Sequence, residues 1–303
     1  MKRTLIMAWR NIWRNKRRTR ITIASIFFAV FFAVVMRSFQ LGTYDHMIHQ
    51  AIESFSGYIQ IQDKEFFYDP SIDNSFEYNE SLITSVKETD NVKVAVPRVE
   101  SFALASTGTQ SKGVLVTGID VAKEKKLSDP ENRLVKYRFT PEIVDMIIDQ
   151  VDLPNKQVEL IRANENQSYS SFSRISLDLA LDKDLEDKLL PVVEKEASFK
   201  SNYLNEDDDG VLVSDRLARY LKANVGDTIV LIGAGYHGMS AANVFPVRGI
   251  VKILSPELDN KLVYMTLGTA QQFFSLGNRI TSLNINLHDT DEMYDTQENL
   301  KKS

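Results

Sequence analysis

The hydrophobic and polar positions of the chain form two regions with different patterns. The run Ile21–Met36 contains no charged residue, and Arg37 is the only charge before Asp45. A helix over residues 21–44 would be about 36 Å long at ~1.5 Å per residue, enough to cross about 30 Å of hydrocarbon. The pattern predicts a transmembrane helix over 21–44, with Arg37 close enough to its end to reach the lipid headgroups.

A cleaved signal peptide is the first alternative to a retained span. Such a peptide has a short basic segment, an apolar region of about 7–15 residues and a small-x-small cleavage site. Here the basic segment is long, covering residues 1–20, and the apolar run ends in Val-Val-Met-Arg. These features favour a retained span over a signal peptide or a buried helix.

The segments on either side of the span also show helical spacing. Apolar residues at this spacing in 4–16 predict a basic amphipathic elbow helix, assigned to residues 1–20, in which Trp9 and Trp13 share one face. That face suits a membrane surface, and it equally suits a neighbouring helix. After the span, helical spacing through residue 56 predicts an amphipathic stalk over 45–56.

The remaining chain alternates between strand-like and helix-like patterns, which predicts an α+β fold. We expect one core domain of mixed α/β type in two parts, 57–130 and 206–288, with an inserted variable lobe over 131–205 and a last helix over 289–303. Strands are predicted over 57–63, 92–107, 112–120, 210–214, 228–232, 245–254, 262–265 and 280–287. Helices are predicted over 80–88 and 269–275. A further helix is expected to follow an N-cap at Ser214 and to end near residue 224. A capping-box-like pair, Asp289 with Glu292, is expected to start a helix over 290–302.

The lobe has a different character from the core. Its first helix is expected to begin at Pro141, because proline is favoured at the first helical position. The alternation in Arg174–Leu181 predicts a strand, and the segment 182–200 is rich in charge.

The charge distribution gives the span a direction. Residues 1–20 hold eight Lys and Arg and no acid. Residues 21–303 therefore hold 28 of the 36 basic residues and all 41 acidic residues, a net charge of −13. The positive-inside bias therefore predicts a cytoplasmic N-terminus and an acidic bulk outside. The side chains expected at the membrane interface are Trp9, Trp13, Arg17, Arg18, Arg20 and Arg37.

Composition excludes several classes of function. The chain contains no cysteine, so it has neither disulfides nor thiolate chemistry. The only basic cluster adjoins the span, where it meets anionic lipid more plausibly than nucleic acid. No nucleophile elbow, Walker loop or His-Glu-x-x-His motif occurs, so no catalytic residue is predicted and the chain itself is not expected to be an enzyme.

Three motifs suggest ligands but do not satisfy their chemistry. The glycines of Gly233–Gly238 have dinucleotide-loop spacing, but a strand follows where a phosphate-binding helix is needed. We interpret this segment as an exposed, flexible hairpin tip whose side chains Tyr236, His237 and Met239 could contact a partner. His46 and His49 lack a clear third ligand, and the segment 205–216 lacks the first and last acids of a calcium loop. No cofactor or metal is therefore predicted.

Several blocks resemble the FtsX-like and MacB-type permeases of ABC transporters, and most closely their lipoprotein-releasing LolC/LolE branch. The blocks retain the order and spacing of the family, whereas residues 130–205 match it poorly. They are Ala8–Arg20, Gly57–Gln62, Val114–Asp120, Gly210–Ala218, Val225–Thr228, Phe245–Ile250 and Val263–Gln271.

The resemblance implies a cytoplasmic elbow helix, a first span and a large periplasmic domain in a bacterial inner membrane, followed by three more spans. The chain departs from this pattern by ending at residue 303, where a second span is expected. The implied function is a permease subunit that works by mechanotransmission, without a cofactor of its own. Its implied partners are cytoplasmic ATPase subunits, a second permease copy or paralogue, the bilayer, and a periplasmic carrier protein or lipoprotein.

Alternatives remain for the cargo and for the role of one face of the stalk. Lipoprotein release from the inner membrane is the leading expectation; MacB-like export and FtsX-like regulation of cell-wall hydrolases are the alternatives within the family. A single-span anchored binding or sensor domain is the alternative of another class. By resemblance, the stalk side chains Met36, Phe39, Tyr44 and Met47 border a substrate path, or else they pack against other spans or a partner permease.

Overall fold

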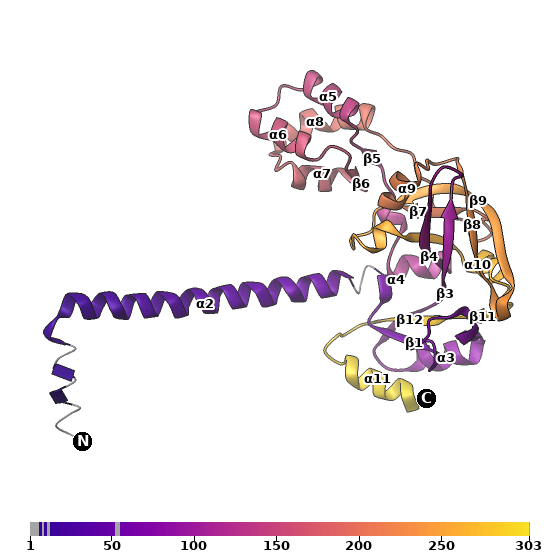
Figure 1. The fold of residues 1–303 in the computed structure, drawn as a ribbon, viewed down its shortest axis with the longest axis horizontal. Coiled ribbons are helices and arrows are strands. Elements are labelled where there is room, and N and C mark those ends of the chain that lie inside the picture. Colours follow the sequence, from indigo (N-terminus) through magenta and orange to yellow (C-terminus); the bar gives the residue numbers. More distant parts are fainter. Residues whose placement is uncertain (1–5, 8, 11–12, 52–54, 303) are drawn as a thin grey trace. The chain divides into compact units, whose positions relative to one another are not determined.

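The computed structural model describes residues 6–7, 9–10, 13–51 and 55–302, without the side chains of 45–51 and 80 (Figure 1). The chain divides into two compact units, Met1–Gln50 and Ala51–Ser303. Each unit is described by itself.

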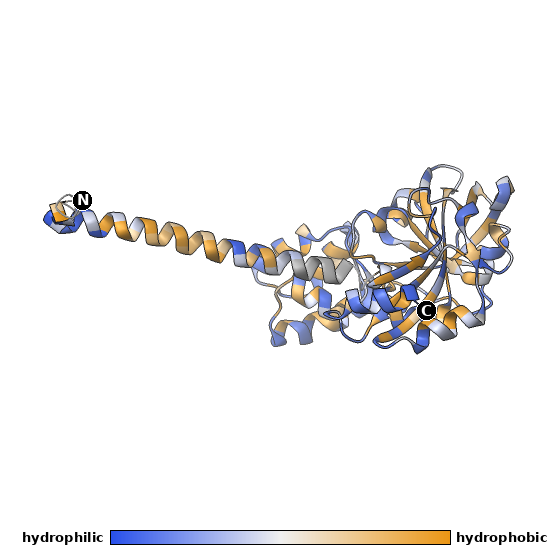
Figure 2. Ribbon diagram, turned by 90° about the horizontal axis from the view of Figure 1, so that it is seen from below, coloured by the Kyte–Doolittle hydropathy of each residue, from blue (hydrophilic) through white to orange (hydrophobic). Residues whose placement is uncertain are grey.

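The first unit is dominated by a single long helix, α2 (Lys16–Ala51). Its segment Lys16–Tyr44 is long and apolar enough to cross a membrane, as the hydropathy colouring of Figure 2 shows. Every side chain of residues 21–36 is exposed in the protein alone. The hydroxyls of Thr22 and Ser25 donate to the carbonyls of Arg18 and Ile21, at 3.0 and 2.9 Å. These polar groups are thus satisfied within the helix, as a lipid environment requires.

The second unit contains a ring of hydrogen-bonded strands. Within residues 55–302 the pairs β3–β4, β4–β10, β10–β7, β7–β9, β9–β8 and β8–β3 close upon themselves. The pairs β4–β10 and β7–β9 are parallel, and the other four are antiparallel. The strands are β3 (Val92–Ser106), β4 (Ser111–Ile119), β7 (Val211–Ser214), β8 (Thr228–Ala234), β9 (Ser240–Val251) and β10 (Leu262–Thr266).

Alternation along β3 shows how the ring is filled. Ala103 and Ala105 are buried, whereas Phe102 and Leu104 between them are exposed. The small inward residues leave room for branched side chains from other strands, and Val116, Val213 and Val263 are all fully buried.

The first half of β3 extends beyond the ring and carries a second group of elements. There β3 pairs with β12 (Ser282–Leu287), and β12 pairs in turn with β1 (Ile59–Gln62), both antiparallel. The other elements of the core are β2 (Phe76–Glu77), β11 (Arg279–Ile280), α3 (Glu80–Glu88), α4 (Val121–Leu127), α9 (Asp215–Leu221), α10 (Leu267–Phe273), α11 (Met293–Lys302) and the 3-10 turns η2 (Ile72–Asn74), η3 (Glu131–Arg133), η4 (Tyr236–Gly238) and η5 (Leu258–Asn260).

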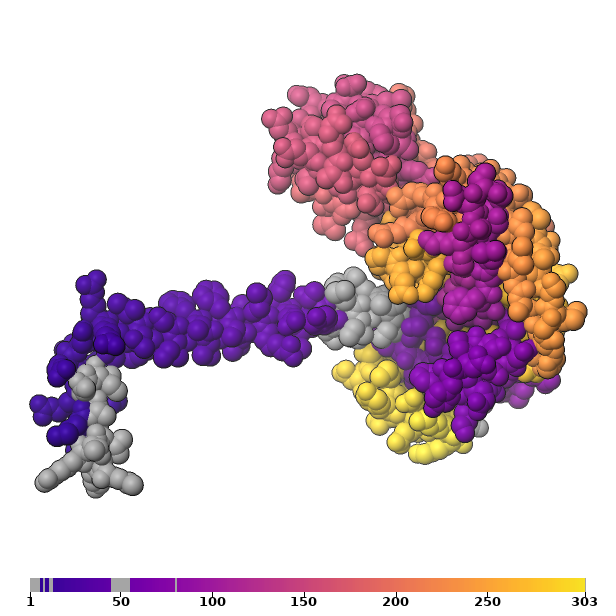
Figure 3. Space-filling model, in the orientation of Figure 1, coloured from indigo at the N-terminus to yellow at the C-terminus, as the bar shows by residue number. Residues whose placement is uncertain are grey.

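The lobe is largely helical and has its own core. Figure 3 shows it in pink as a rounded mass within the second unit. Phe139, Ile147, Ile161 and Leu189 are fully buried among its helices. Its elements are β5 (Tyr137–Arg138), α5 (Pro141–Gln150), α6 (Asn155–Ala163), β6 (Ser168–Tyr169), α7 (Phe172–Asp178) and α8 (Lys183–Glu196).

The structure confirms the α+β class, and most predicted elements are present with small shifts of their ends. The strand predicted over Arg174–Leu181 is wrong, because the helix α7 covers residues 174–178 and buries Ile175, and its C-cap residue Leu179 is buried one turn later. Ser214 occupies the N-cap position of α9, but its hydroxyl accepts the amide of Leu262 at 3.3 Å instead of capping the helix. That helix ends at Leu221, earlier than predicted, because Lys222 adopts a left-handed conformation with φ 56°.

Candidate functional site

The chain enters and leaves the core on neighbouring strands. β1 is the first strand after α2 and β12 is the last before α11, and the two are paired, with Ile59 opposite Ile285. Just before β1, the carbonyl of Ser56 accepts the Asn284 side-chain amide at 2.8 Å. Gly57 has φ +70°, and a Cβ there would lie 2.8 Å from the carbonyl oxygen of Ile285. This close approach requires glycine, so the entry point is held against β12.

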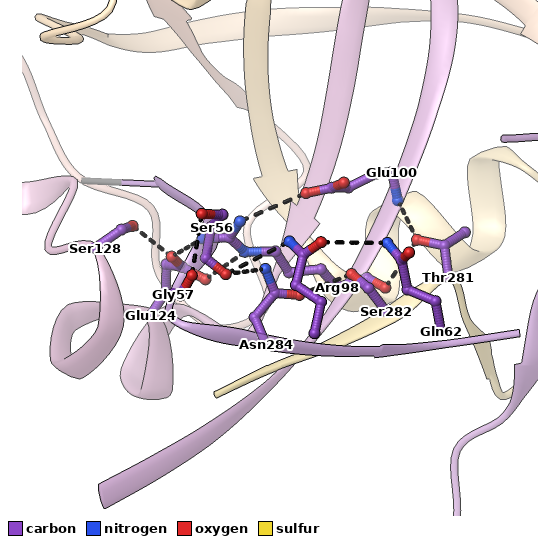
Figure 4. Close-up of polar contacts among 11 residues, drawn as sticks. Ser56, Gly57, Gln62, Arg98, Glu100, Glu124, Ser128, Thr281, Ser282 and Asn284 are labelled. Atoms are coloured by element: carbon purple, nitrogen blue, oxygen red, sulfur yellow. Dashed lines mark hydrogen bonds and ion pairs between the residues drawn. The ribbon is translucent and has the colours of Figure 1, made fainter. Parts of the chain in front are cut away.

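A buried ion pair lies next to this entry point (Figure 4). Arg98 of β3 donates from Nε and Nη2 to the two carboxylate oxygens of Glu124 in α4, at 3.1 and 2.5 Å. Both side chains are fully buried, and Ser128 Oγ also donates to Glu124. The third nitrogen, Nη1, lies 3.4 Å from Glu100 Oε1. A guanidinium with such a fork is matched to a carboxylate in both geometry and charge.

The same arginine contacts the segment that follows α2 in the chain. Its guanidinium carbon lies 4.8 Å from the centre of the Phe55 ring. A cation over an aromatic face is attracted by the ring quadrupole, and more strongly when water is excluded. Arg98 therefore connects residue 55, strand β3 and helix α4, while Asn284 connects residue 56 to β12.

Burial and charge shift the pKa values in opposite directions here. Burial alone lowers the pKa of Arg98, but the charge and hydrogen bonds of Glu124 outweigh it and leave the pKa above the ordinary guanidinium value. Burial raises the pKa of Glu100 despite the opposing effect of Arg98. The buried Arg98 is thus held between the buried carboxylate of Glu124 and the partly buried carboxyl group of Glu100.

This shift predicts a pH-dependent effect of the substitution Glu100→Gln. A carboxyl group with a raised pKa in the folded state favours the protonated form, so its ionisation at pH 7 disfavours folding. We expect E100Q to raise the unfolding midpoint relative to the parent chain at pH 7. The difference should shrink as the pH falls toward the ordinary carboxyl range, because Glu100 is then protonated in both states.

Unfolding of the full chain in neutral detergent between pH 4 and 8 measures this difference. Glu77→Gln, an exposed position on β2, serves as the control and should show little pH-dependent difference. A midpoint difference for E100Q that grows as the pH falls would contradict the assigned shift.

The predicted interface residues are exposed on the first unit. The rings of Trp9 and Trp13 have centroids 6.0 Å apart, so the two tryptophans share one face as predicted. Arg37 Nη1 donates to Gln40 at 3.3 Å, and Arg20 Nε donates to the carbonyl of Lys16 at 3.3 Å. Their location at a membrane interface, together with that of Arg17 and Arg18, stays a prediction.

Three of the four predicted substrate-path side chains are exposed on α2. Met36, Phe39 and Tyr44 are exposed by 69, 74 and 54%, and the side chain of Met47 lies outside the described residues. Exposure of this kind fits a substrate, another span and lipid equally well. The two alternatives for this face therefore remain open.

The hairpin tip is fixed at several points. The amide of His237 donates to Asp73 of η2 at 2.6 Å, and the amide of Tyr236 donates to the carbonyl of Phe274 at 2.8 Å. The Tyr236 ring is half-buried with the Arg279 guanidinium 5.1 Å from its centre, whereas Met239 is 58% exposed. A partner contact at the tip stays a prediction, and of its three side chains His237 and Met239 are exposed.

Two acids of the turn before β7 pair with a basic residue. Arg248 of β9 pairs with Asp208 and Asp209 at 2.8 and 2.9 Å. Among the residues that the structure describes, no group of three or more His, Cys, Asp and Glu is suited to a metal ion. The side chains of His46 and His49 lie outside the described residues.

The ion pair is the part of the site that the sequence did not reveal. A weak signal existed in Arg98, the only charge in the run Val94–Val99 of a predicted strand. Its partner Glu124 lies in the charged stretch Lys123–Lys126, which gives no sign that one member is buried. Only the packing of α4 on β3 brings the two together.

Comparison with known proteins finds distant structural neighbours only. No family model and no curated protein matches the sequence. The extracellular domain of the noncanonic ABC-type transporter YknZ from Gram-positive bacteria is 12% identical with a TM-score of 0.39, and the match covers 80% of this chain and 91% of that one. The periplasmic region of MacB from Actinobacillus actinomycetemcomitans is 11% identical with a TM-score of 0.41, covering 80% and 79%. Similarity at this level carries no argument about activity.

Proposed function

We propose that the chain is a membrane-anchored permease subunit of an ABC transporter and that it works by mechanotransmission. The observation that supports this most is the pairing of β1 with β12, which brings the entry and the exit of the core together. A domain inserted between two membrane spans needs its two connections at one end. The blocks that resemble FtsX-like and MacB-type permeases add support from the sequence.

In this proposal α2 acts as a lever on the core. Movement of the helix reaches residues 55–57 through the chain, and these residues are held by Arg98, Asn284 and the backbone of β12. β3 carries Arg98, pairs with β12 and is also a strand of the ring, so a pull at the entry point is passed into the ring. Packed connections of this kind transmit displacement because protein interiors deform little.

The proposal places the protein in a bacterial inner membrane, with the N-terminus in the cytoplasm and the core and lobe in the periplasm. ATP hydrolysis would be carried out by separate cytoplasmic subunits, and a second permease copy or paralogue would complete the membrane part. We further propose lipoproteins released from the inner membrane as the cargo. MacB-like export and regulation of cell-wall hydrolases are the functions to distinguish from it.

Purification tests the transporter proposal. The tagged gene product, expressed from its own locus and extracted in mild detergent, should retain an ATPase with Walker motifs that hydrolyses ATP in the complex. A single-span protein with the same tag controls for adhesion to the resin. A chain that binds no nucleotide-hydrolysing partner would instead fit an anchored binding or sensor domain.

Depletion tests the cargo separately. If the cargo is lipoprotein, loss of the protein should leave lipoproteins in the inner membrane, as measured by membrane fractionation. Normal lipoprotein sorting would contradict this cargo while leaving the ATPase result unaffected.

The proposed orientation predicts a labelling pattern, and the absence of cysteine makes it direct to measure. Asn15→Cys and Lys126→Cys introduce single thiols at exposed positions before and after the span. In spheroplasts, we expect a membrane-impermeant maleimide to label Cys at 126 fully and Cys at 15 only after lysis. Labelling of position 15 in intact spheroplasts would contradict the cytoplasmic N-terminus.

A further inference from the structure

A cavity of about 400 Å³ lies where the lobe meets the core. The lobe contributes the segment 167–170 with Arg174 and Asp178, and the core contributes Lys252 and Leu254. Arg133 of η3 falls within the range predicted for the lobe, but its carbonyl accepts the amide of Lys252 at 2.8 Å, which joins it to the core. This volume is within the range of small-molecule sites, which is ~300–1,000 Å³. No residue of the proposed lever network lines it.

Basic side chains outnumber acids around this cavity. The buried Asp215 receives Arg138, Arg219 and Lys252 at 3.4, 3.0 and 3.3 Å, together with the Ser168 hydroxyl at 2.7 Å. Three acidic and six basic residues lie in the cavity wall and in this cluster. The acids are Asp178, Asp215 and Asp259, and the bases are Arg133, Arg138, Arg174, Arg216, Arg219 and Lys252. The local excess of positive charge contrasts with the net charge of −5 of the whole chain.

Some of these donors have no acceptor. The Nη1 atom of Arg133 and the Nε atoms of Arg138 and Arg219 are buried and make no hydrogen bond within the part of the chain that the structure describes. Within the same part, no ion pair with an N–O distance up to 4.0 Å includes Arg133 or Arg174, although the charge of Asp129 acts on Arg133. Burial lowers the pKa of the Arg133 and Arg138 guanidinium groups. Of these three arginines only Arg133 lines the cavity, and the buried Oδ2 of Asp259 in the neighbouring cluster likewise has no hydrogen-bond donor among the described residues. A buried donor without an acceptor is costly, so Nη1 of Arg133 favours an added acceptor with negative charge in the cavity.

We propose that this cavity binds an organic phosphate, with Arg133 from the core and Arg174 from the lobe as the two groups that hold the phosphate. Two guanidinium groups on opposite sides offer more N–H donors than one carboxylate can accept. A phosphate matches them better, because its acceptor oxygens point in several directions. The volume exceeds what a bare phosphate fills, and Leu254, 44% exposed, borders the space for an organic remainder. The ligand would join the lobe to the core and restrain the lobe.

The test uses the full chain in a neutral detergent, with glycerol 3-phosphate as the probe and sodium chloride at equal ionic strength as the reference. We expect near-saturating probe to raise the unfolding midpoint by about 5 °C. Arg133→Gln and Arg174→Gln should each weaken binding about tenfold or more. Lys156→Gln, an exposed charge on the lobe outside the cavity, should bind like the parent chain.

Three results would overturn the proposal. They are a midpoint shift no larger than that in chloride, an unchanged shift in R174Q, and an equal shift with succinate in place of the phosphate. Arg174 is exposed, so R174Q keeps the test valid if R133Q fails to fold.

Hydrogen exchange of residues 167–178 distinguishes two sources of the phosphate. Protection in nanodiscs of phosphatidylglycerol, but not of phosphatidylcholine, would assign the site to a lipid headgroup. Protection only after glycerol 3-phosphate is added would assign it to a soluble ester. An absence of protection in all of these conditions would overturn the site.

Discussion

Replacing Arg98 by methionine should destabilise the core by about 3–5 kcal/mol, because Glu124 is then left buried without its counter-charge. For a unit of this size that loss lowers the unfolding midpoint by roughly 6–20 °C. The double variant R98M/E124L removes both charges and should recover most of the loss. Urea and thermal unfolding of the full chain, combined in a double-mutant cycle, give the coupling energy directly.

The neighbouring exposed lysine of β3 provides the control for this cycle. Lys93→Gln should change the free energy of unfolding by no more than about 0.5 kcal/mol. If R98M alone were as stable as the parent chain, Glu124 would have another source of compensation and the ion pair would not fix α4 to β3. Additive effects of R98M and E124L would lead to the same conclusion.

The fold was predictable where local signals and packing agree. Asn79 caps α3 by accepting the amide of Leu82, Thr140 caps α5 before Pro141, and both helices lie where the sequence predicted them. The error at Arg174–Leu181 has a physical origin, since the apolar positions Ile175, Leu177 and Leu179 fit a period of two as well as they fit a short helix. Burial decides between the two, because Leu177 is 67% exposed while its two neighbours in the pattern are buried.

The closure of the ring could not be read from the sequence. It depends on the length of β3, whose first half pairs with β12 while residues 103–106 pair with β8 more than 120 positions later in the chain. The lobe–core cavity is equally non-local, because Arg133 and Arg174 come from separate parts of the chain. In contrast, the long apolar helix depends only on consecutive residues, which is why the sequence alone could predict a helix long and apolar enough to cross a membrane.

The lever proposal predicts a loss of transport without a loss of stability. Inserting Gly-Ser-Gly-Ser after Ala51, the last residue of α2, leaves every described contact of Phe55 and Ser56 in place. A Gly/Ser segment behaves as a flexible coil and cannot pass on a directed displacement over its length. We expect ATP-driven transport by the complete complex to fall at least about tenfold, while the unfolding midpoint of the core stays unchanged.

The same insertion between Glu206 and Asp207 is the matched control, because this exposed turn lies outside the path from α2 to the ring. It should retain transport. ATP hydrolysis is measured in the variant with the insertion after Ala51. Continued hydrolysis without transport indicates uncoupling at the lever, as proposed. Normal transport by the variant with the insertion after Ala51 would show that a rigid connection to residues 55–57 is not required, and the core would then act as a tethered binding domain instead of a mechanical one.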